Sequence, residues 1–271
     1  MIDAIVFSKD RAAQLDLLLQ SLHINGEGIF NEPLILYRAS DADYAQAYTH
    51  LDGAHFQEET KLKFDVMEAV RNCGPLFCFL VDDQIMWRKP GFNHEHVKKA
   101  MVAHPKASCL SLRLGRNTAW QYQSHRSIRQ PNFQDAGPFL LWNRNTCDPY
   151  TNYNYPLSVD AHIFRRDEIL CLLEKAQFTQ PNQLEAQLQA FVSSVEPLML
   201  CPPISVFVNA AVNRVQSLFP NKVGNKEEYK AAEMNRRFLG GDRLSLDKTV
   251  KDLEVTSCHQ EIDLQWEECH V

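Results

Sequence analysis

The chain has 271 residues, of which 45% are hydrophobic, and its 34 acidic and 28 basic residues give a formal net charge of −6. This acidic balance argues against a nucleic-acid-binding protein, because such proteins are usually basic. The length suits one large α/β domain with a sizeable core. Met1 is not followed by a secretory leader, and no apolar run approaches the roughly 20 residues that span a bilayer. We therefore expect a cytoplasmic protein without a transmembrane segment, whose membrane contact, if any, is peripheral.

The cysteine pattern argues against a disulfide framework or a zinc site, because none of the cysteines forms a C-x-x-C pair. Most of them lie in apolar surroundings, where a cysteine behaves as a small hydrophobic residue. We expect free thiols at Cys73, Cys78, Cys109, Cys147, Cys171, Cys201, Cys258 and Cys269.

The first third of the chain alternates apolar runs with helical patterns. Strands are expected at residues 4–7, 33–37, 54–56 and 76–81. Helices are expected between them, closed at Asn25-Gly26, at Tyr48 and before Cys73-Gly74-Pro75. The order β-α-β-α-β-α-β predicts an open, mostly parallel, doubly wound sheet with helices on both faces.

The run Leu-Phe-Cys-Phe-Leu-Val at residues 76–81 ends in Asp82 and Asp83. A continuous apolar run of this kind is typical of a central strand buried on both faces. Because unpaired carboxylates cost several kcal/mol inside such a sheet, we expect both acids at its carboxyl edge, where α/β folds bind ligands. Two acids there suit a divalent cation and a diphosphate. An ordinary Asp-Asp turn is the alternative.

In the rest of the chain, further strands are expected at residues 108–114, 160–164 and 203–208. Helices are expected at 94–103, 166–173, 181–195 and 233–239. Residues 118–155 combine aromatic side chains with many amides, which favours either a sugar-binding loop or a hairpin that packs its rings on the core.

Three segments together resemble the GT-A fold nucleotide-sugar glycosyltransferases, most closely the family 2 type. They are Ile-Val-Phe-Ser-Lys-Asp-Arg at 5–11, Leu-Val-Asp-Asp at 80–83 and Tyr-Pro-Leu-Ser-Val-Asp-Ala-His-Ile-Phe-Arg at 155–165. The resemblance covers residues 1–215 and is strongest in the first 90. It implies one glycosyltransferase domain over 1–271, with a nucleotide-binding half (1–90) and an acceptor-binding half with a C-terminal tail (91–271).

By this resemblance, the nucleotide base would lie against the ends of the first two strands, which carry Ser8, Asp10, Arg11 and Asp41. Lys63 could reach a phosphate from its helix. The alternative for Asp10 and Arg11 is a solvated helix start capped by Asp10, and for Lys63 an exposed position.

The same resemblance implies Mn²⁺ or Mg²⁺ as cofactor, held by Asp83, while Asp82 would bond the ribose or support the metal. Position 84 is Gln84, where many relatives carry a carboxylate, so metal affinity could be reduced or the metal dispensable. His259 is expected as a further metal ligand, since several GT-A enzymes use a late histidine. A structural or exposed histidine is the alternative.

Inverting members of the family use a carboxylate to take the proton of the acceptor hydroxyl. Glu185 is the expected base, because the family places this residue at a helix start after the acceptor loop. Its alternative is a first-turn carboxylate that stabilises the helix dipole. Asp160 is the second candidate, either as base or as a partner for the sugar or acceptor.

We therefore expect an enzyme of glycan biosynthesis that moves a sugar from a UDP- or GDP-sugar to a glycan, lipid-linked or small-molecule acceptor. Inversion at the sugar is expected. A sugar nucleotidyltransferase is one alternative, although the turn at residues 8–11 has no glycine. A catalytically silent sugar- or nucleotide-binding protein on the same fold is the other, since a fold alone does not establish activity.

Overall fold

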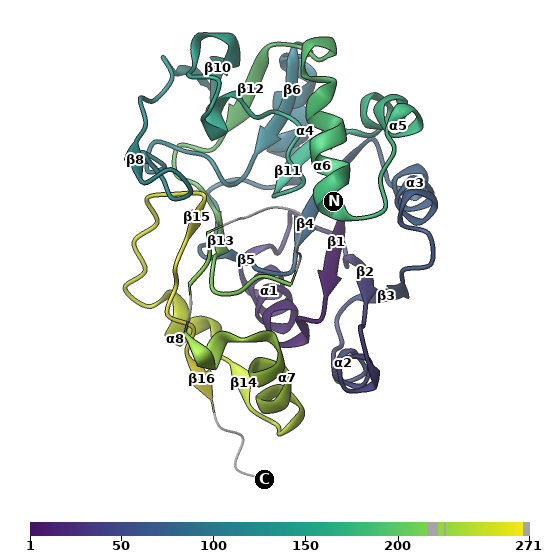
Figure 1. The fold of residues 1–271 in the computed structure, drawn as a ribbon. Coiled ribbons are helices and arrows are strands. Elements are labelled where there is room, and N and C mark those ends of the chain that lie inside the picture. The colour runs from purple at the N-terminus through teal and green to yellow at the C-terminus, as the bar shows by residue number, and fades with distance from the viewer. Residues whose placement is uncertain (216–221, 225, 268–271) are drawn as a thin grey trace.

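The computed structural model describes residues 1–215, 222–224 and 226–267, and a nine-stranded sheet forms its centre (Figure 1). The strands of this sheet are β1 (Asp3–Lys9), β2 (Leu34–Arg38), β3 (His55–Glu58), β4 (Leu76–Val81), β6 (Ala107–Ser111), β9 (Gln134–Ala136), β10 (Phe139–Asn143), β11 (His162–Arg165) and β12 (Leu198–Cys201). Their spatial order is β3-β2-β1-β4-β11-β6-β12-β10-β9. The first four are mutually parallel, whereas β11 runs antiparallel to both β4 and β6. The predicted α/β fold with a mostly parallel sheet is confirmed.

Helices cover both faces of the sheet, because successive residues of each buried strand point to opposite sides. Ala4 and Val6 of β1 pack with α1 (Ala12–Asn25), α2 (Ala42–Tyr48), α4 (His94–Ala103), α7 (Ala231–Leu239) and α8 (Leu246–Val250). Ile5 and Phe7 pack on the other face with α3 (Leu62–Asn72), α5 (Arg166–Lys175) and α6 (Pro181–Ala190). Two apolar cores therefore enclose the sheet, which is the doubly wound arrangement.

A smaller sheet forms beside the carboxyl end of β4 from strands that are far apart in the sequence. It contains β5 (Gln84–Met86), β13 (Phe207–Ala210) and β15 (His259–Gln260), in the order β15-β13-β5. Its register pairs Asn209 with Gln84 on one side and with His259 on the other. The C-terminal segment, yellow in Figure 1, is thereby brought next to the acidic motif.

One hairpin, one further strand pair and four short 3₁₀ turns complete the described elements. The hairpin pairs β7 (Trp120–Gln121) with β8 (Arg126–Ser127), and the further antiparallel pair joins β14 (Arg243–Leu244) to β16 (Trp266–Glu267). The turns are η1 (Arg144–Thr146), η2 (Asn152–Asn154), η3 (Val192–Ser194) and η4 (Glu227–Tyr229).

Some element boundaries differ from the predictions. The strand expected over 108–114 ends at Ser111, although Leu112 and Leu114 remain fully buried. The strand expected over 203–208 begins only at Phe207, since prolines at 202 and 203 cannot donate to a ladder. The helix from Pro181 ends at Ala190. Strand β12 was not expected from the sequence.

The sequence left two alternatives open for the aromatic segment 118–155: a sugar-binding loop, or a hairpin that packs its rings on the core. Some of its rings pack on the core and others line a cavity. Phe139, Trp142 and Tyr153 are at most 2% exposed, and β10 joins the main sheet. These rings pack on the core, and the indole of Trp142 donates to the backbone oxygen of Tyr153 at 2.9 Å. Tyr150 and Tyr155 instead line the cavity described below.

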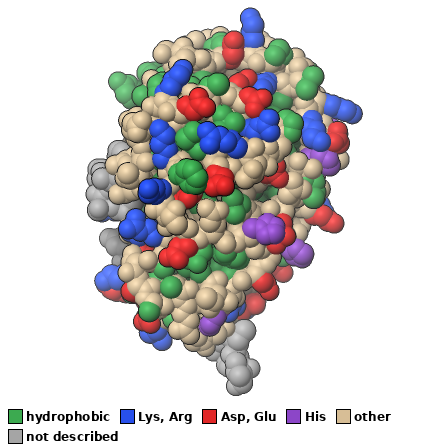
Figure 2. Space-filling view, turned by 90° about the vertical axis from the view of Figure 1, so that its right-hand side faces the viewer, with side chains coloured by type: hydrophobic (Ala, Val, Ile, Leu, Met, Phe, Trp, Pro, Cys, Tyr) green, Lys and Arg blue, Asp and Glu red, His purple; other side chains and the backbone are tan. Residues whose placement is uncertain are grey.

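Acidic and basic side chains are interspersed on the side of the molecule that carries α3 and α5 (Figure 2). In the described ranges, no helix combines the length and the apolar character needed to cross a bilayer. The seven described cysteines are all free thiols, as predicted, and Cys269 lies outside the described residues.

Candidate active site

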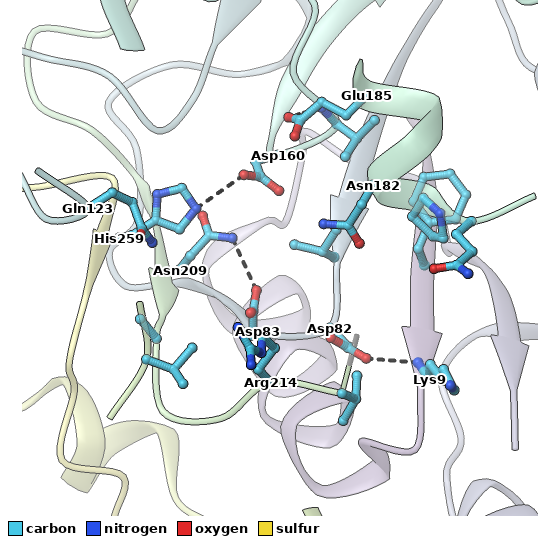
Figure 3. A pocket seen from close by; sticks show the side chains of 18 of the residues that line it. Lys9, Asp82, Asp83, Gln123, Asp160, Asn182, Glu185, Asn209, Arg214 and His259 are labelled. Carbon is cyan, nitrogen blue, oxygen red and sulfur yellow. Dashed lines mark hydrogen bonds and ion pairs between the residues drawn. The ribbon is translucent and has the colours of Figure 1, made fainter. Parts of the chain in front are cut away.

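A cavity of about 720 Å³ opens at the carboxyl edge of the main sheet. Its walls come from the ends of β1 and β4, the loop before β11, the start of α6 and the small sheet (Figure 3). Seven of the residues proposed from the sequence line it together: Ser8, Arg11, Asp82, Asp83, Asp160, Glu185 and His259. Residues as far apart in the chain as Ser8 and His259 therefore meet at the sheet edge that the acidic strand predicted.

Asp82 is turned toward the loop after β1 and is only 4% exposed. Its Oδ2 accepts hydrogen bonds from the Ser8 hydroxyl and the Lys9 backbone N–H, both at 3.0 Å. Its Oδ1 accepts from Arg11 Nη1 at 2.9 Å. The carboxylate thus holds the β1–α1 loop in place, a contribution that the sequence did not predict.

Asp83 points into the cavity. Its Oδ1 accepts from the Asn209 amide at 3.1 Å, and its Oδ2 lies 3.3 Å from Arg11 Nη1. Burial raises the pKa of Asp83; the charge of Arg11 lowers it, whereas Asp82 and Asp160 raise it further. A further cation beside Asp83 would therefore favour its ionised form.

Arg11 occupies the N-cap position of α1 and bridges both acids, while its Nη2 donates to the backbone oxygen of Asn213 at 2.8 Å. Burial opposes its charge, but Asp82 and Asp83 outweigh that effect and raise the pKa of Arg11. The cap has no side-chain hydrogen bond, so the alternative in which Asp10 caps this helix is wrong.

Gln84 is fully buried, and its side-chain amide orients neighbouring residues by hydrogen bonds. Its Oε1 accepts from the Val81 N–H at 3.1 Å, which leaves its Nε2 facing Asn209 Oδ1 at 3.4 Å. The amide nitrogen of Asn209 is consequently the end that meets Asp83. A carboxylate at position 84 could not supply this donor.

A second cluster of charged residues, Arg113, Asp160 and His259, forms the cavity wall opposite Asp82 and Asp83. Arg113, 1% exposed, donates to Asp160 Oδ2 at 2.7 Å, and His259 Nε2 lies 3.4 Å from the same oxygen. Burial favours the neutral form of Asp160, yet Arg113 and His259 outweigh it and lower the pKa to about 2. Such a carboxylate holds protons too weakly to act as a general base near neutral pH.

Glu185 reaches the cavity from the second turn of α6. The helix begins at Pro181 and carries no acid in its first turn, so the helix-dipole alternative is wrong. Glu185 Oε1 accepts from the Ser158 hydroxyl at 2.6 Å and from the Val159 N–H at 3.3 Å. Burial and the charge of Asp160 raise the pKa of Glu185, which suits a group that must take up a proton.

Three residues proposed from the sequence are placed elsewhere, outside the described lining of the cavity. Asp10 accepts hydrogen bonds from the backbone and hydroxyl of Ser40. Asp41 caps α2 by accepting from the Tyr44 N–H at 3.0 Å. Lys63 donates to the backbone oxygens of Glu174 and Ala176 at the end of α5, so its ammonium is turned away from the site.

Sequence reasoning missed Arg113, Asn209 and Ser158. Arg113 carried a usable signal, since a lone arginine in the apolar run Ser-Cys-Leu-Ser-Leu-Arg-Leu must find a buried carboxylate or leave the core. Asn209 and Ser158 gave no comparable signal, because small polar residues are ordinary at strand ends.

The site fits a divalent cation only in part. In the described ranges, no group of three histidine, cysteine or acidic side chains is placed to hold a metal ion. Mg²⁺ commonly binds through one or two carboxylates and takes its remaining ligands from substrate phosphates and water. Asp83 could serve in this way, since each carboxylate oxygen keeps a lone pair beyond the contacts described above.

This chain is similar to a curated glycosyltransferase. Bifunctional glycosyltransferase pgtA of Dictyostelium discoideum is 22% identical over 257 residues, a match covering 81% of this chain and 33% of that protein. The chain therefore spans about a third of the length of this curated relative. The match confirms the predicted resemblance to glycosyltransferases. No protein-family model matches the sequence.

Solved structures give weaker likenesses. Residues 1–349 of S. aureus TarS superpose with a TM-score of 0.42 and 15% identity, covering 76% of this chain and 60% of that one. Glucosyl-3-phosphoglycerate synthase from Mycobacterium tuberculosis gives a TM-score of 0.40 and 12% identity, covering 88% and 77%. Scores this low say nothing about the chemistry of the present site.

Proposed function

We propose that this chain is a glycosyltransferase that moves a sugar from a UDP- or GDP-sugar to an acceptor hydroxyl, with inversion at the sugar carbon. One observation carries the proposal: a single cavity holds Asp83 at the carboxyl edge of the sheet and Glu185, with its raised pKa, on the facing wall (Figure 3). The similarity to a glycosyltransferase supports it.

In the proposed reaction the acceptor oxygen attacks the anomeric carbon as the bond between that carbon and the diphosphate oxygen breaks. The diphosphate leaves with the electron pair, and the acceptor proton passes to Glu185. Arg11, held by Asp82 and Asp83, and the exposed Lys9 line the cavity where the diphosphate charge would develop, and cations there stabilise the transition state.

Mn²⁺ or Mg²⁺ is proposed as the cofactor, with Asp83 as its protein ligand. When bound, the cation would neutralise the leaving diphosphate. His259 remains a proposed further ligand. Its Nε2 faces Asp160, and a carboxylate partner of this kind commonly fixes the orientation of a ligating imidazole.

The acceptor is proposed to be a neutral saccharide. The cavity wall formed by the β7–β8 hairpin, the loop before β11 and the start of α6 carries uncharged amide and hydroxyl side chains: Gln121, Gln123, Thr151, Asn152, Thr179, Gln180 and Asn182. Tyr150, which is 78% exposed, adds an aromatic face. Amides and hydroxyls bond sugar hydroxyls, and rings pack on sugar C–H faces.

The test is nucleoside diphosphate release from UDP-glucose, UDP-galactose, UDP-N-acetylglucosamine and GDP-mannose, each with and without Mn²⁺. Neutral disaccharides and glucose 6-phosphate serve as acceptors. We expect one nucleotide class to be consumed, faster with a neutral acceptor than with water. Binding of a donor without turnover under any of these conditions would favour the silent binding protein.

A further inference from the structure

Ser158 lies fully buried between the two charged groups of the acceptor wall. Its Oγ is 3.0 Å from Arg113 Nη2, 3.2 Å from the backbone nitrogen of Asp160 and 2.6 Å from Glu185 Oε1. Among the described residues, Ser158 is the one whose side chain is hydrogen-bonded to both Arg113 and Glu185.

The direction of these hydrogen bonds follows from chemistry. A serine hydroxyl has one hydrogen to donate and two lone pairs with which to accept. The Arg113 guanidinium and the Asp160 N–H can only donate, so they take both lone pairs. The single Ser158 hydrogen must therefore go to Glu185, and 2.6 Å is typical of a hydroxyl bonded to an ionised carboxylate.

We propose that Ser158 is a positioning residue that holds Glu185 Oε1 and leaves Oε2 as the oxygen that takes the acceptor proton. This inference rests on the role of Glu185 in the proposed function. The Val159 N–H, at 3.3 Å, is the second donor to Oε1. Both donors come from consecutive residues of the loop before β11 and meet the same oxygen, so together they hold Oε1 in place.

The charged and titratable groups that face Glu185 are Asp160, Arg113 and Tyr155, and the Tyr155 hydroxyl is also hydrogen-bonded to the Glu185 carboxylate. Burial and Asp160 raise the pKa of Glu185, whereas the Ser158 hydroxyl, Arg113 and the Val159 N–H lower it. Loss of the hydroxyl must therefore raise this pKa further. A base must be ionised to act. The reduction in transfer rate caused by loss of the Ser158 hydroxyl should therefore be greatest at acid pH and should become smaller as the pH rises.

The test compares wild type with Ser158→Ala and with Ser158→Cys. The cysteine variant keeps a side chain of similar volume but is only a weak hydrogen-bond donor. Ser108→Ala is the matched control, because Ser108 is a buried serine that donates to the backbone oxygen of Leu198 and lies outside the described lining of the cavity. At pH 6 we expect Ser158→Ala to transfer at least about ten-fold more slowly than wild type, the loss expected for a hydrogen bond to a charged group. The donor KM should stay unchanged.

Two further measurements separate this inference from a structural effect and from failure of the proposed function. In protein labelled with ¹³C at glutamate carboxyls, the resonance missing from Glu185→Gln should titrate at higher pH in Ser158→Ala, whether or not transfer occurs. On a Glu185→Gln background, Ser158→Ala should cause no further loss. The role of Ser158 would be overturned if the pKa of Glu185 were the same in Ser158→Ala as in wild type. It would also be overturned if Ser158→Ala slowed transfer as much on the Glu185→Gln background as it does in wild type.

Discussion

Glu185→Gln is expected to lower kcat for transfer by about 10²–10⁴-fold, the range that a positioned general base contributes. Glutamine keeps the oxygen that accepts from Ser158 and Val159, so α6 and the cavity wall should retain their geometry. It replaces the proton-accepting oxygen by an amide group that has no affinity for a proton at neutral pH. Binding of the nucleotide should not change.

The measurement is initial-rate transfer by wild type, Glu185→Gln and Glu68→Gln. The last is the matched control, because Glu68 is an exposed carboxylate on α3 outside the described lining of the cavity. Transfer by Glu185→Gln within ten-fold of wild type would contradict the inverting assignment. A retaining mechanism, which needs no strong base at this position, would then be favoured.

Arg113→Met is expected to lower the free energy of unfolding by about 3–5 kcal/mol, the cost of removing one partner from a buried ion pair. Asp160, whose side chain is 13% exposed, would lose its 2.7 Å partner, and Ser158 would lose a donor. The Arg113–Asp160 pair should stabilise the fold fully above the unfolded pKa of an aspartate. That contribution should be lost as the pH falls toward about 2, where folded Asp160 takes up a proton.

Urea unfolding at pH 7 and near pH 3 tests this expectation. Arg236→Met is the control, since Arg236 pairs with Glu233 on the surface of α7 and such pairs contribute at most about 1 kcal/mol. The difference between wild type and Arg113→Met should be smaller near pH 3 than at pH 7. Equal losses in the two arginine variants would contradict a structural role for the buried pair.

Local sequence was sufficient to predict the parallel strands β1 to β4 and the place of the acidic motif. The apolar run at 76–81 can be satisfied only inside a sheet, and the two acids that follow it can be satisfied only at the edge. The helix predicted over about 94–103 is observed over His94–Ala103, where Asn93 caps it by accepting from the His96 N–H.

The contacts that complete the site could not be predicted, because they join segments far apart in the chain. Asn209 meets Asp83 only because β13 pairs with β5, and His259 meets Asp160 only because β15 pairs with β13. Lys63 shows the converse: its place on α3 was predicted, but the packing of α5 against α3 decides what its ammonium contacts. Phe139 and Trp142 likewise lie in the core because β10 joins the sheet edge.

The most direct measurement is thermal unfolding of wild type and Asp83→Ala with UDP, GDP, CDP and dTDP, each with and without Mn²⁺. A ligand that binds only the folded state adds about 2.7 kcal/mol at 100 times its Kd. We predict a raised Tm with one nucleotide, dependent on Mn²⁺ and absent from Asp83→Ala. No rise with any nucleotide would contradict a nucleotide-sugar site, and a rise indifferent to Mn²⁺ would contradict the proposed metal role of Asp83.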